Sequence, residues 1–238
     1  MHAYRNTGSL LLALIAAALL GGCATTANNP KDPWEGTNRV MFSVHEGIDT
    51  AVLKPVAKGY DAVTPDLVQA GIGNFFSNID DLPVMVNDLL QGKPADAVSD
   101  LGRVVMNTTF GLLGFFDIAT QAGLEKHDED FGQTFGRWGV NSGPYVFIPV
   151  FGPRTARDSV GLVFDIYADP VGYVSNVRLR NSMIVVRAIS YRAELLPADK
   201  VIDEAALDKY AYIRDAYLQS RENLVYDGSP PHSKDSDE

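Results

Sequence analysis

The sequence predicts an all-α fold, on three observations. Apolar residues recur mainly at the three- and four-residue spacing of one helix face. The alternation of apolar and polar residues that is typical of strands is scarce. Of the 238 residues, 46% are hydrophobic and 21% are charged, which is the composition of a globular chain and not of a disordered one. We therefore expect one helical domain over residues 32–226.

The first 22 residues have the pattern of a lipoprotein signal peptide. The apolar run 10–20, at about 1.5 Å per residue, is too short to span a bilayer as a helix. It leads into Gly21-Gly22-Cys23, and small residues before a cysteine resemble the bacterial lipobox, where that cysteine is acylated. Cys23 is the only cysteine of the chain, so it has no partner for an internal disulfide. We therefore expect cleavage before Cys23 and membrane anchoring by acyl chains on it.

The two ends of the mature chain are expected to be irregular. Residues 23–31 are mostly small and polar, as in a tether between a lipidated cysteine and a folded body. The residue after Cys23 is Ala24 and not Asp, and similar lipoproteins of two-membrane bacteria pass to the outer membrane. We therefore expect the protein to be lipid-anchored at the outer membrane, on its periplasmic side. Residues 227–238 lack large apolar side chains and are expected to form a disordered acidic tail.

Apolar spacing predicts six helices in the body: 35–54, 66–91, 94–110, 153–168, 181–196 and 203–224. Pro83 predicts a break in the second of them. Residues 145–151 are apolar but do not alternate, and they include Pro149, so that a loop and a strand fit equally well. Large apolar residues also gather in the Gly-rich segments 110–116 and 138–151, where they either pack in a core or lie in a lipid layer without crossing it.

Two of the expected helices carry a polar stripe opposite an apolar face. The stripe of 94–110 consists of Asp96, Asp100, Arg103 and Asn107, and that of 153–168 consists of Arg154, Asp158 and Asp165. A charged face usually points to water. If these helices lie in lipid, the charges instead turn towards one another or towards a wet passage, because a charge in hydrocarbon is costly. On spacing alone, these seven residues are the candidate channel-lining residues.

Sequence patterns of catalysis, metal binding or nucleic-acid binding are missing. The chain has no H-E-x-x-H, no G-x-S-x-G around Ser159 and no phosphate-binding G-x-x-x-x-G-K-[ST]. The acidic run 127–130 does not start an EF-hand, because the twelfth position from Asp128 is Gly139, so we expect a solvated loop there. The net charge of −10 disfavours a nucleic-acid partner. We therefore expect no enzyme activity, no cofactor and no bound metal.

Seven sequence blocks in order resemble the MlaA (VacJ) family of outer-membrane lipoproteins, over about residues 23–168. Besides the lipobox at Cys23, they are Asp32-Pro33-Trp34-Glu35-Gly36-Thr37-Asn38-Arg39, Asn74-Phe75-Phe76-Ser77-Asn78, Asn87-Asp88-Leu89-Leu90-Gln91-Gly92-Lys93, Arg103 with Met106-Asn107-Thr108-Thr109, Glu129 to Gly136 with Trp138-Gly139-Val140, and Gly143-Pro144-Tyr145 to Gly152-Pro153 with Arg157-Asp158. Residues 169–238 add little beyond their helical pattern.

The resemblance implies a ring-shaped bundle of amphipathic helices that lies in the inner leaflet of the outer membrane around a central polar channel. It implies transport and not catalysis: misplaced phospholipids are taken from the outer leaflet and passed to a periplasmic lipid carrier of the Mla pathway, so that lipid asymmetry is maintained. It also implies a trimeric porin as partner.

A second hypothesis is a lipoprotein scaffold that only tethers a porin or another envelope protein. The polar stripes separate the two hypotheses. If the channel exists, we expect Asp100→Leu or Arg103→Leu to leave folding intact and to let phospholipid accumulate in the outer leaflet. A lipid hydrolase is disfavoured, because the chain lacks a recognisable nucleophile motif.

Overall fold

The computed structural model describes residues 29–231, so the expected signal peptide, Cys23 and residues 24–28 of the tether lie outside it, as do residues 232–238. The elements run in this order: α2 (Glu35–Ile48), a π-helical stretch (Asp49–Leu53), α3 (Lys54–Val63), α4 (Asp66–Gln91), α5 (Pro94–Phe110), α6 (Ile118–Gln121), α7 (Phe131–Arg137), β1 (Tyr145–Ile148), β2 (Gly152–Thr155), α8 (Ala156–Ala168), a 3-10 turn (Pro170–Tyr173), α9 (Val177–Glu194), α10 (Leu196–Ala205) and α11 (Lys209–Val225). The all-α class is confirmed.

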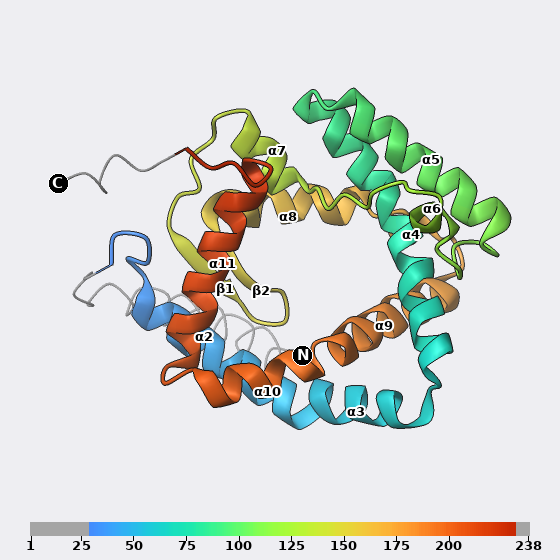
Figure 1. Cartoon of the computed structure of the whole chain (residues 1–238). Helices are drawn as coiled ribbons and strands as arrows, with labels where there is room; N and C mark the ends of the chain where they lie inside the picture. Colours follow the sequence, from blue (N-terminus) through green and yellow to red (C-terminus); the bar gives the residue numbers. More distant parts are fainter. Residues whose placement is uncertain (1–28, 232–238) are drawn as a thin grey trace, which may run out of the picture.

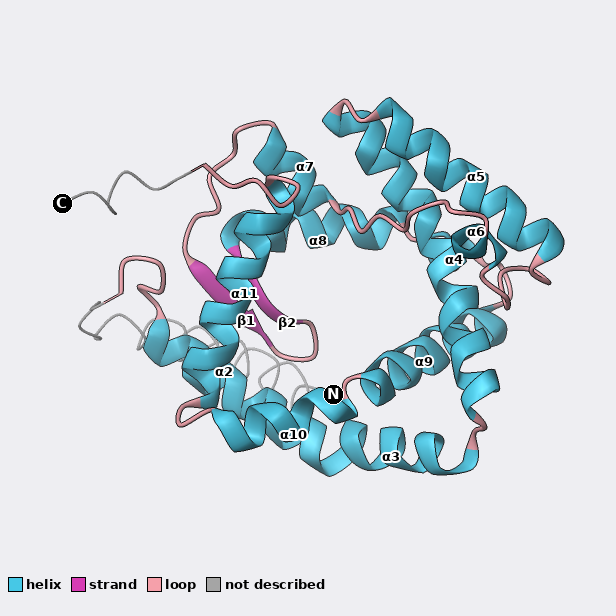
Figure 2. Cartoon of the chain, in the orientation of Figure 1, coloured by secondary structure: helices cyan, strands magenta, loops and turns pink. Residues whose placement is uncertain are grey.

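The helices are arranged as a ring, with α3, α4, α9 and α10 on one side and α7, α8, α11 and the hairpin on the other (Figure 1). The strands β1 and β2 form a hairpin (Figure 2). The hairpin is antiparallel, and its register pairs Tyr145 with Thr155 and Ile148 with Gly152. For residues 145–151, a loop and a strand had fitted the sequence equally well. The structure has a strand over the first four of these residues, 145–148. No helix among the residues described is long and apolar enough to cross a membrane.

The N-terminal and C-terminal parts of the ring are joined through the buried side chains of Asp32 and Asn38. The Asn38 amide donates to Asp32 Oδ1 at 2.8 Å and to the Tyr145 carbonyl oxygen at 3.0 Å. Asp32 Oδ2 in turn accepts a hydrogen bond from the Tyr210 hydroxyl of α11 at 2.6 Å. Tyr145, Tyr210 and Phe147 form a small hydrophobic core beside these bonds. Helix α2, the hairpin and α11 are thus held together where the ring closes.

Helix α5 folds back along α4 through a glycine turn. Gly92 has the left-handed φ of 79°, which L side chains rarely adopt, and the Lys93 amide then donates to the Asp88 carbonyl oxygen at 2.8 Å. The two helices pack along most of their length. This turn places the polar residues of α5 opposite those of α4, which is the basis of the clusters described below.

Three sequence expectations about the helices are wrong. Helix α4 continues through Pro83, because the lost amide donor affects one hydrogen bond while α5 and α9 pack along the helix. The stretch 203–224 is divided between α10 and α11, and Asp208 caps the second by accepting from the Ala211 amide. Helix α8 begins at Ala156, so Arg154 lies on β2 and not on the same helix as Asp158 and Asp165.

The C-terminal boundary also differs from the expectation. Asp227, the first residue of the expected tail, forms ion pairs with Lys93 and Arg137 and therefore belongs to the body. The turn that carries it continues directly from α11.

Candidate functional site

Large apolar side chains lie mostly on the surface of the part of the chain that is described, and many charged ones lie inside. Phe110 is 72% exposed and Leu112 69%, whereas Asp81 and Asp100 are inaccessible to solvent. The exposed apolar residues of α8 and α9 are Val160, Val163, Phe164, Ile166, Tyr167, Val177, Leu179, Ile184, Val185, Val186 and Tyr191. A water-soluble protein normally shows the reverse distribution. Much of the exposed surface of these residues therefore suits an apolar medium.

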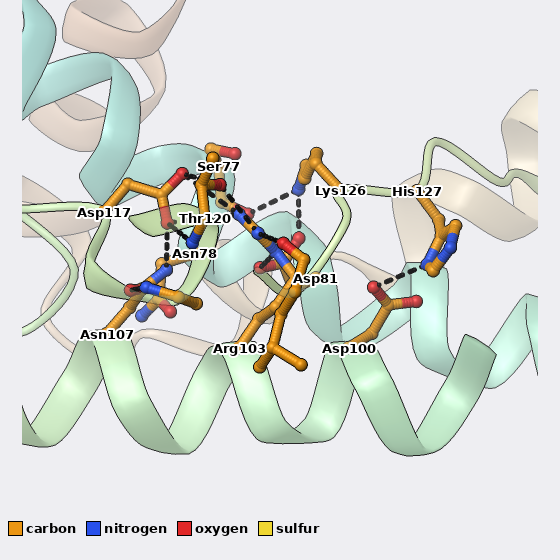
Figure 3. A network of polar contacts seen from close by, with 12 residues as sticks. Ser77, Asn78, Asp81, Asp100, Arg103, Asn107, Asp117, Thr120, Lys126 and His127 are labelled. Carbon is orange, nitrogen blue, oxygen red and sulfur yellow. Dashed lines mark hydrogen bonds and ion pairs between the residues drawn. The ribbon is translucent and has the colours of Figure 1, made fainter. Parts of the chain in front are cut away.

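The polar stripe of α5 is bound within the wall of the ring. Figure 3 shows Asp100, Arg103 and Asn107 pointing from one side of α5 towards the segment 117–127. Arg103, which is 2% exposed, donates to Thr120 Oγ1 at 2.9 Å and to the Leu124 carbonyl oxygen at 2.8 Å. Its guanidinium also pairs with two carboxylates, Asp81 of α4 and Asp117, at 3.4 and 3.2 Å. We call these residues, with Asn107, the Arg103 cluster.

Asp117 is the acceptor at the edge of the Arg103 cluster. Burial alone would raise its pKa, but hydrogen bonds from Thr120 and Asn107 and the charge of Arg103 lower it to about 2. The Asn107 amide donates to Asp117 at 3.0 Å, and its carbonyl accepts from the Ala119 amide at 2.8 Å. The cluster therefore fixes the segment after α5 as well as the α4–α5 pair.

A second buried cluster joins α8 to α11. The buried carboxylate of Asp158 accepts from the Tyr217 hydroxyl at 2.7 Å and pairs with Arg221 and with Arg157. Burial raises the pKa of Asp158, but the Arg221 charge and the Tyr217 hydrogen bond outweigh it and lower the pKa. Arg221 also pairs with Asp130, the N-cap of α7. The Arg221 cluster thus ties three helices together.

The seven candidate channel-lining residues therefore fall into different environments. Asp100, Arg103, Asn107 and Asp158 are 3% exposed or less, and in this conformation they contact protein. Asp96 keeps a side-chain exposure of 44%. Asp165 and Arg154 are half-buried. That any of the seven lines a passage stays a prediction, and for the four buried ones it requires the wall to open.

Asp165 caps the start of α7 from α8. Its Oδ1 accepts the Phe131 amide at 2.9 Å, and burial raises the pKa of its carboxyl to about 6 in spite of that bond. Asp158 and Asp165 are therefore on the same helix but contact different partners.

The acidic run 127–130 is anchored and not freely solvated. His127 Nδ1 lies 3.0 Å from Asp100 Oδ1, and Glu129 pairs with Lys93 at 2.7 Å. Asp130 caps the start of α7. Of the four residues 127–130, Asp128 alone is exposed. The expectation of a solvated loop is wrong for the other three, because their partners lie on α4, α5 and α11, which are distant in sequence.

Two adjoining cavities lie between α4 and α9. The charged cavity, of about 330 Å³, is lined by Asp80, Lys126, Asp128, Arg187, Glu194 and neighbouring residues. The apolar cavity, of about 310 Å³, is lined by Ile72, Phe75, Phe115, Leu179, Met183 and neighbouring residues. Phe76 contributes to both. None of these residues is among the site residues predicted from the sequence, although Asn74-Phe75-Phe76-Ser77 belongs to one of the blocks of the resemblance.

Arg187 is the central charge of the charged cavity. It pairs with Asp80 of α4 at 3.2 Å and with Asp169 at 2.8 Å, and it keeps a side-chain exposure of 33%. Burial raises the pKa of Asp80 to about 6, although Arg187 opposes this. Lys126 pairs with Asp81 and donates to the Ser77 carbonyl oxygen. A charged cavity beside an apolar one fits a molecule with a polar head and an apolar tail.

Comparison with known proteins identifies the family. The family model described as "MlaA lipoprotein" matches residues 30–224. The chain belongs to the MlaA lipoprotein family. The intermembrane phospholipid transport system lipoprotein MlaA of Haemophilus influenzae is 32% identical over 97% of this chain and 96% of its own length. Its Escherichia coli namesake is 31% identical, with 90% of this chain and 87% of the relative covered.

A relative from Rickettsia bellii is 35% identical, with 82% of this chain and 76% of its own length covered. A solved structure described as "Structural basis for maintenance of bacterial outer membrane lipid asymmetry" superposes with a TM-score of 0.71 and 33% identity, over 82% of this chain and 98% of the other. The MlaA resemblance seen in the sequence is thereby confirmed, and it extends past residue 168 to residue 224.

Proposed function

We propose that this MlaA-family protein moves phospholipid in the bacterial envelope, taking misplaced phospholipids from the outer leaflet of the outer membrane and passing them to a periplasmic carrier. The observation that carries the proposal is the pair of adjoining cavities between α4 and α9, one charged and one apolar. The names of the Haemophilus and Escherichia relatives, which refer to intermembrane phospholipid transport, support the same substrate.

The charged cavity suits the head group of a phospholipid, and the apolar cavity suits its acyl chains. The head group carries a phosphate, which a guanidinium such as that of Arg187 binds well, and the exposed third of that side chain leaves it accessible. An acyl chain finds apolar walls at Phe75, Phe115 and Met183. Phe76 lies at the boundary of both cavities, where head and tail of one molecule would meet.

The exposed apolar surface supports a position within one leaflet. Helices α8 and α9 present Val163, Ile166, Ile184 and Val185 to their surroundings, and a helix lying in the plane of a leaflet buries such side chains in lipid. After Phe110, the consecutive Leu112 and Leu113 adopt left-handed φ values of 52° and 61°, with side chains 69% and 65% exposed. We place this surface in the inner leaflet of the outer membrane.

The remaining parts of the proposal follow from the lipobox and from the family resemblance. Acyl chains on Cys23 anchor the protein on the periplasmic side of the outer membrane, and a trimeric porin covers part of the apolar surface. We propose that the protein carries phospholipid without any catalytic step. A polar passage through the centre of the ring, as the resemblance implies, connects the outer leaflet with the carrier.

The proposal is tested in a Gram-negative strain that lacks its own MlaA-family protein. Phosphatidylethanolamine in the outer leaflet is measured on intact cells with an amine reagent that does not cross membranes. Expression of this chain is expected to bring the signal down to that of the parent strain. Arg187→Gln is expected to leave this signal high, because the charged cavity loses its central cation, and Arg187→Lys is expected to retain activity in part.

Arg178→Gln is the matched control, because Arg178 is an exposed arginine on the same helix that does not line either cavity. The amount of each variant in the outer membrane is measured alongside. If this chain reaches the membrane in normal amount and fails to restore asymmetry, the transport function is wrong. If it restores asymmetry and Arg187→Gln does so equally well, the role of the α4–α9 cavities is wrong and a scaffold role gains support.

A further inference from the structure

Asp88, Asp100 and His127 form a compact buried group between three segments of the chain. Asp88 lies on α4, Asp100 on α5 and His127 on the loop before α7. One ligand-type atom from each lies within 4.8 Å of the other two. His127 Nδ1 is 3.0 Å from Asp100 Oδ1, and the two side chains point towards each other in Figure 3. The α4–α5 turn at Gly92 brings the two carboxylates together.

Three of the four carboxylate oxygens of this group lack hydrogen-bond donors among the described residues. Asp88 is 1% exposed and Asp100 is inaccessible. Both oxygens of Asp88 and Oδ2 of Asp100 are buried without any partner. An unpaired buried carboxylate is costly, and two beside each other are more so. Other buried carboxylates of this protein, such as Asp81 and Asp158, have arginine or lysine partners. Asp88 and Asp100 therefore need either a bound cation or a shared proton.

We propose that Asp88, Asp100 and His127 bind one divalent transition-metal ion, with Zn²⁺ as the best match. Two carboxylates and one imidazole are a ligand set that Zn²⁺ accepts, with a fourth position for water. In a tetrahedral Zn²⁺ site with metal–ligand distances of about 2.0 to 2.1 Å, the ligand atoms are about 3.3 Å from one another. The ligand-type atoms of Asp88, Asp100 and His127 already lie within 4.8 Å of one another, so small side-chain rotations bring them to this spacing. The imidazole disfavours Ca²⁺ and Mg²⁺, which prefer oxygen ligands.

The surroundings of His127 fit a ligand role. With Nδ1 towards the metal, the other ring nitrogen points to the carboxylate of Asp96, whose Oδ1 is 4.0 Å from Nε2. A carboxylate behind a metal-binding histidine is the usual second partner, since it fixes the ring and its tautomer. The metal would hold α4, α5 and the loop together.

The test uses the full-length lipoprotein, purified in detergent and stripped with a chelator. It is dialysed against Zn²⁺, with Mn²⁺ and Ca²⁺ in separate arms, and bound metal and the melting temperature are measured. We expect about one Zn²⁺ per chain and a higher melting temperature, because a ligand of the folded state stabilises it. Ca²⁺ should bind less tightly. Asp88→Asn and His127→Gln should each weaken Zn²⁺ binding by at least about tenfold.

Asp128→Asn is the matched control, because Asp128 is an exposed acid next to His127, and it should bind Zn²⁺ as the wild type does. If Asp88→Asn does not fold, His127→Gln decides, because its half-buried loop position tolerates the change. Without metal, Asp88→Asn should melt higher than the stripped wild type, since it removes one of two adjacent acids. The proposal is overturned if Zn²⁺ binds the wild type no more tightly than the variants and leaves the melting temperature of the wild type unchanged. In that case the carboxyls of Asp88 and Asp100 share a proton instead of a metal ion. Neither result depends on lipid transport.

Discussion

Gly161 of α8 packs directly against Gly132 of α7. A Cβ on Gly161 would lie 2.7 Å from the Cα of Gly132, closer than real side chains come to a backbone. The contact lets the two helices approach, and it keeps Asp158 of α8 within reach of Arg221. The glycines at this crossing are therefore a packing requirement of the ring wall.

Gly161→Ala is expected to lower the free energy of unfolding by about 1 to 3 kcal/mol, because the helices must move apart. Chemical denaturation followed by circular dichroism measures the change. Gly59→Ala is the control, since Gly59 lies within α3 with no atom near its Cβ position, and alanine there should stabilise by up to about 1 kcal/mol. Equal stability of Gly161→Ala and the wild type would contradict the close packing.

Arg103→Leu is expected to destabilise the fold by about 3 to 5 kcal/mol, because it leaves the buried Asp81 without one of its cations and the Leu124 carbonyl without its donor. From the sequence alone, and if the channel exists, we expected Arg103→Leu to fold normally and to fail in phospholipid transport. Unfolding measurements on Arg103→Leu and on the exposed Arg178→Leu separate the two expectations. A normal unfolding curve for Arg103→Leu would support the channel-lining role.

Asp165→Asn is expected to stabilise the protein at pH 7 by about 1 kcal/mol and to flatten its pH dependence. The pKa of Asp165 is raised from 3.8 to about 6, so the folded state binds a proton more readily than the unfolded one between these values. The wild type should therefore lose stability as the pH rises through this window. Melting temperatures from pH 4 to 7 test this, with Asp128→Asn as an exposed control, and an unchanged profile in Asp165→Asn would refute it.

Cys23→Ala is expected to abolish lipidation, so that the chain accumulates as an uncleaved precursor or is released from the membrane. Mass spectrometry of the amino terminus and membrane fractionation measure both effects. Ala24→Asp is the matched control, because it keeps the acylated cysteine and should change only the destination, to the inner membrane. Normal cleavage and retention of Cys23→Ala would show that Cys23 is not the anchor.

Helical spacing predicted much of the fold, because an amphipathic helix repeats its pattern locally. The stripe of α5 was predicted with the boundaries that the structure has. Pro83 and Arg154 were misplaced for a different reason: tertiary packing carries α4 past a proline, and β2 takes up residues that match a helical repeat by chance. Sequence spacing contains neither effect.

The sites were harder to predict than the helices. Asp88 and His127 are 39 positions apart in the numbering and meet only because α5 folds back along α4, so a search for contiguous metal motifs misses them. The α4–α9 cavities likewise combine Phe75 with Met183, and residues 169–238 had offered no motif. The polar stripes were found, but spacing could not tell a wet passage from a buried network.

The most direct test of the account is to ask whether phospholipid enters the apolar cavity between α4 and α9. A photo-reactive amino acid replaces Met183 in the lipoprotein, cells are irradiated, and the purified protein is analysed by mass spectrometry, with the same probe at the exposed Glu222 of α11 as control. We expect a phospholipid adduct at position 183 and none at 222. A membrane-bound protein that gives no phospholipid adduct at position 183 would contradict it.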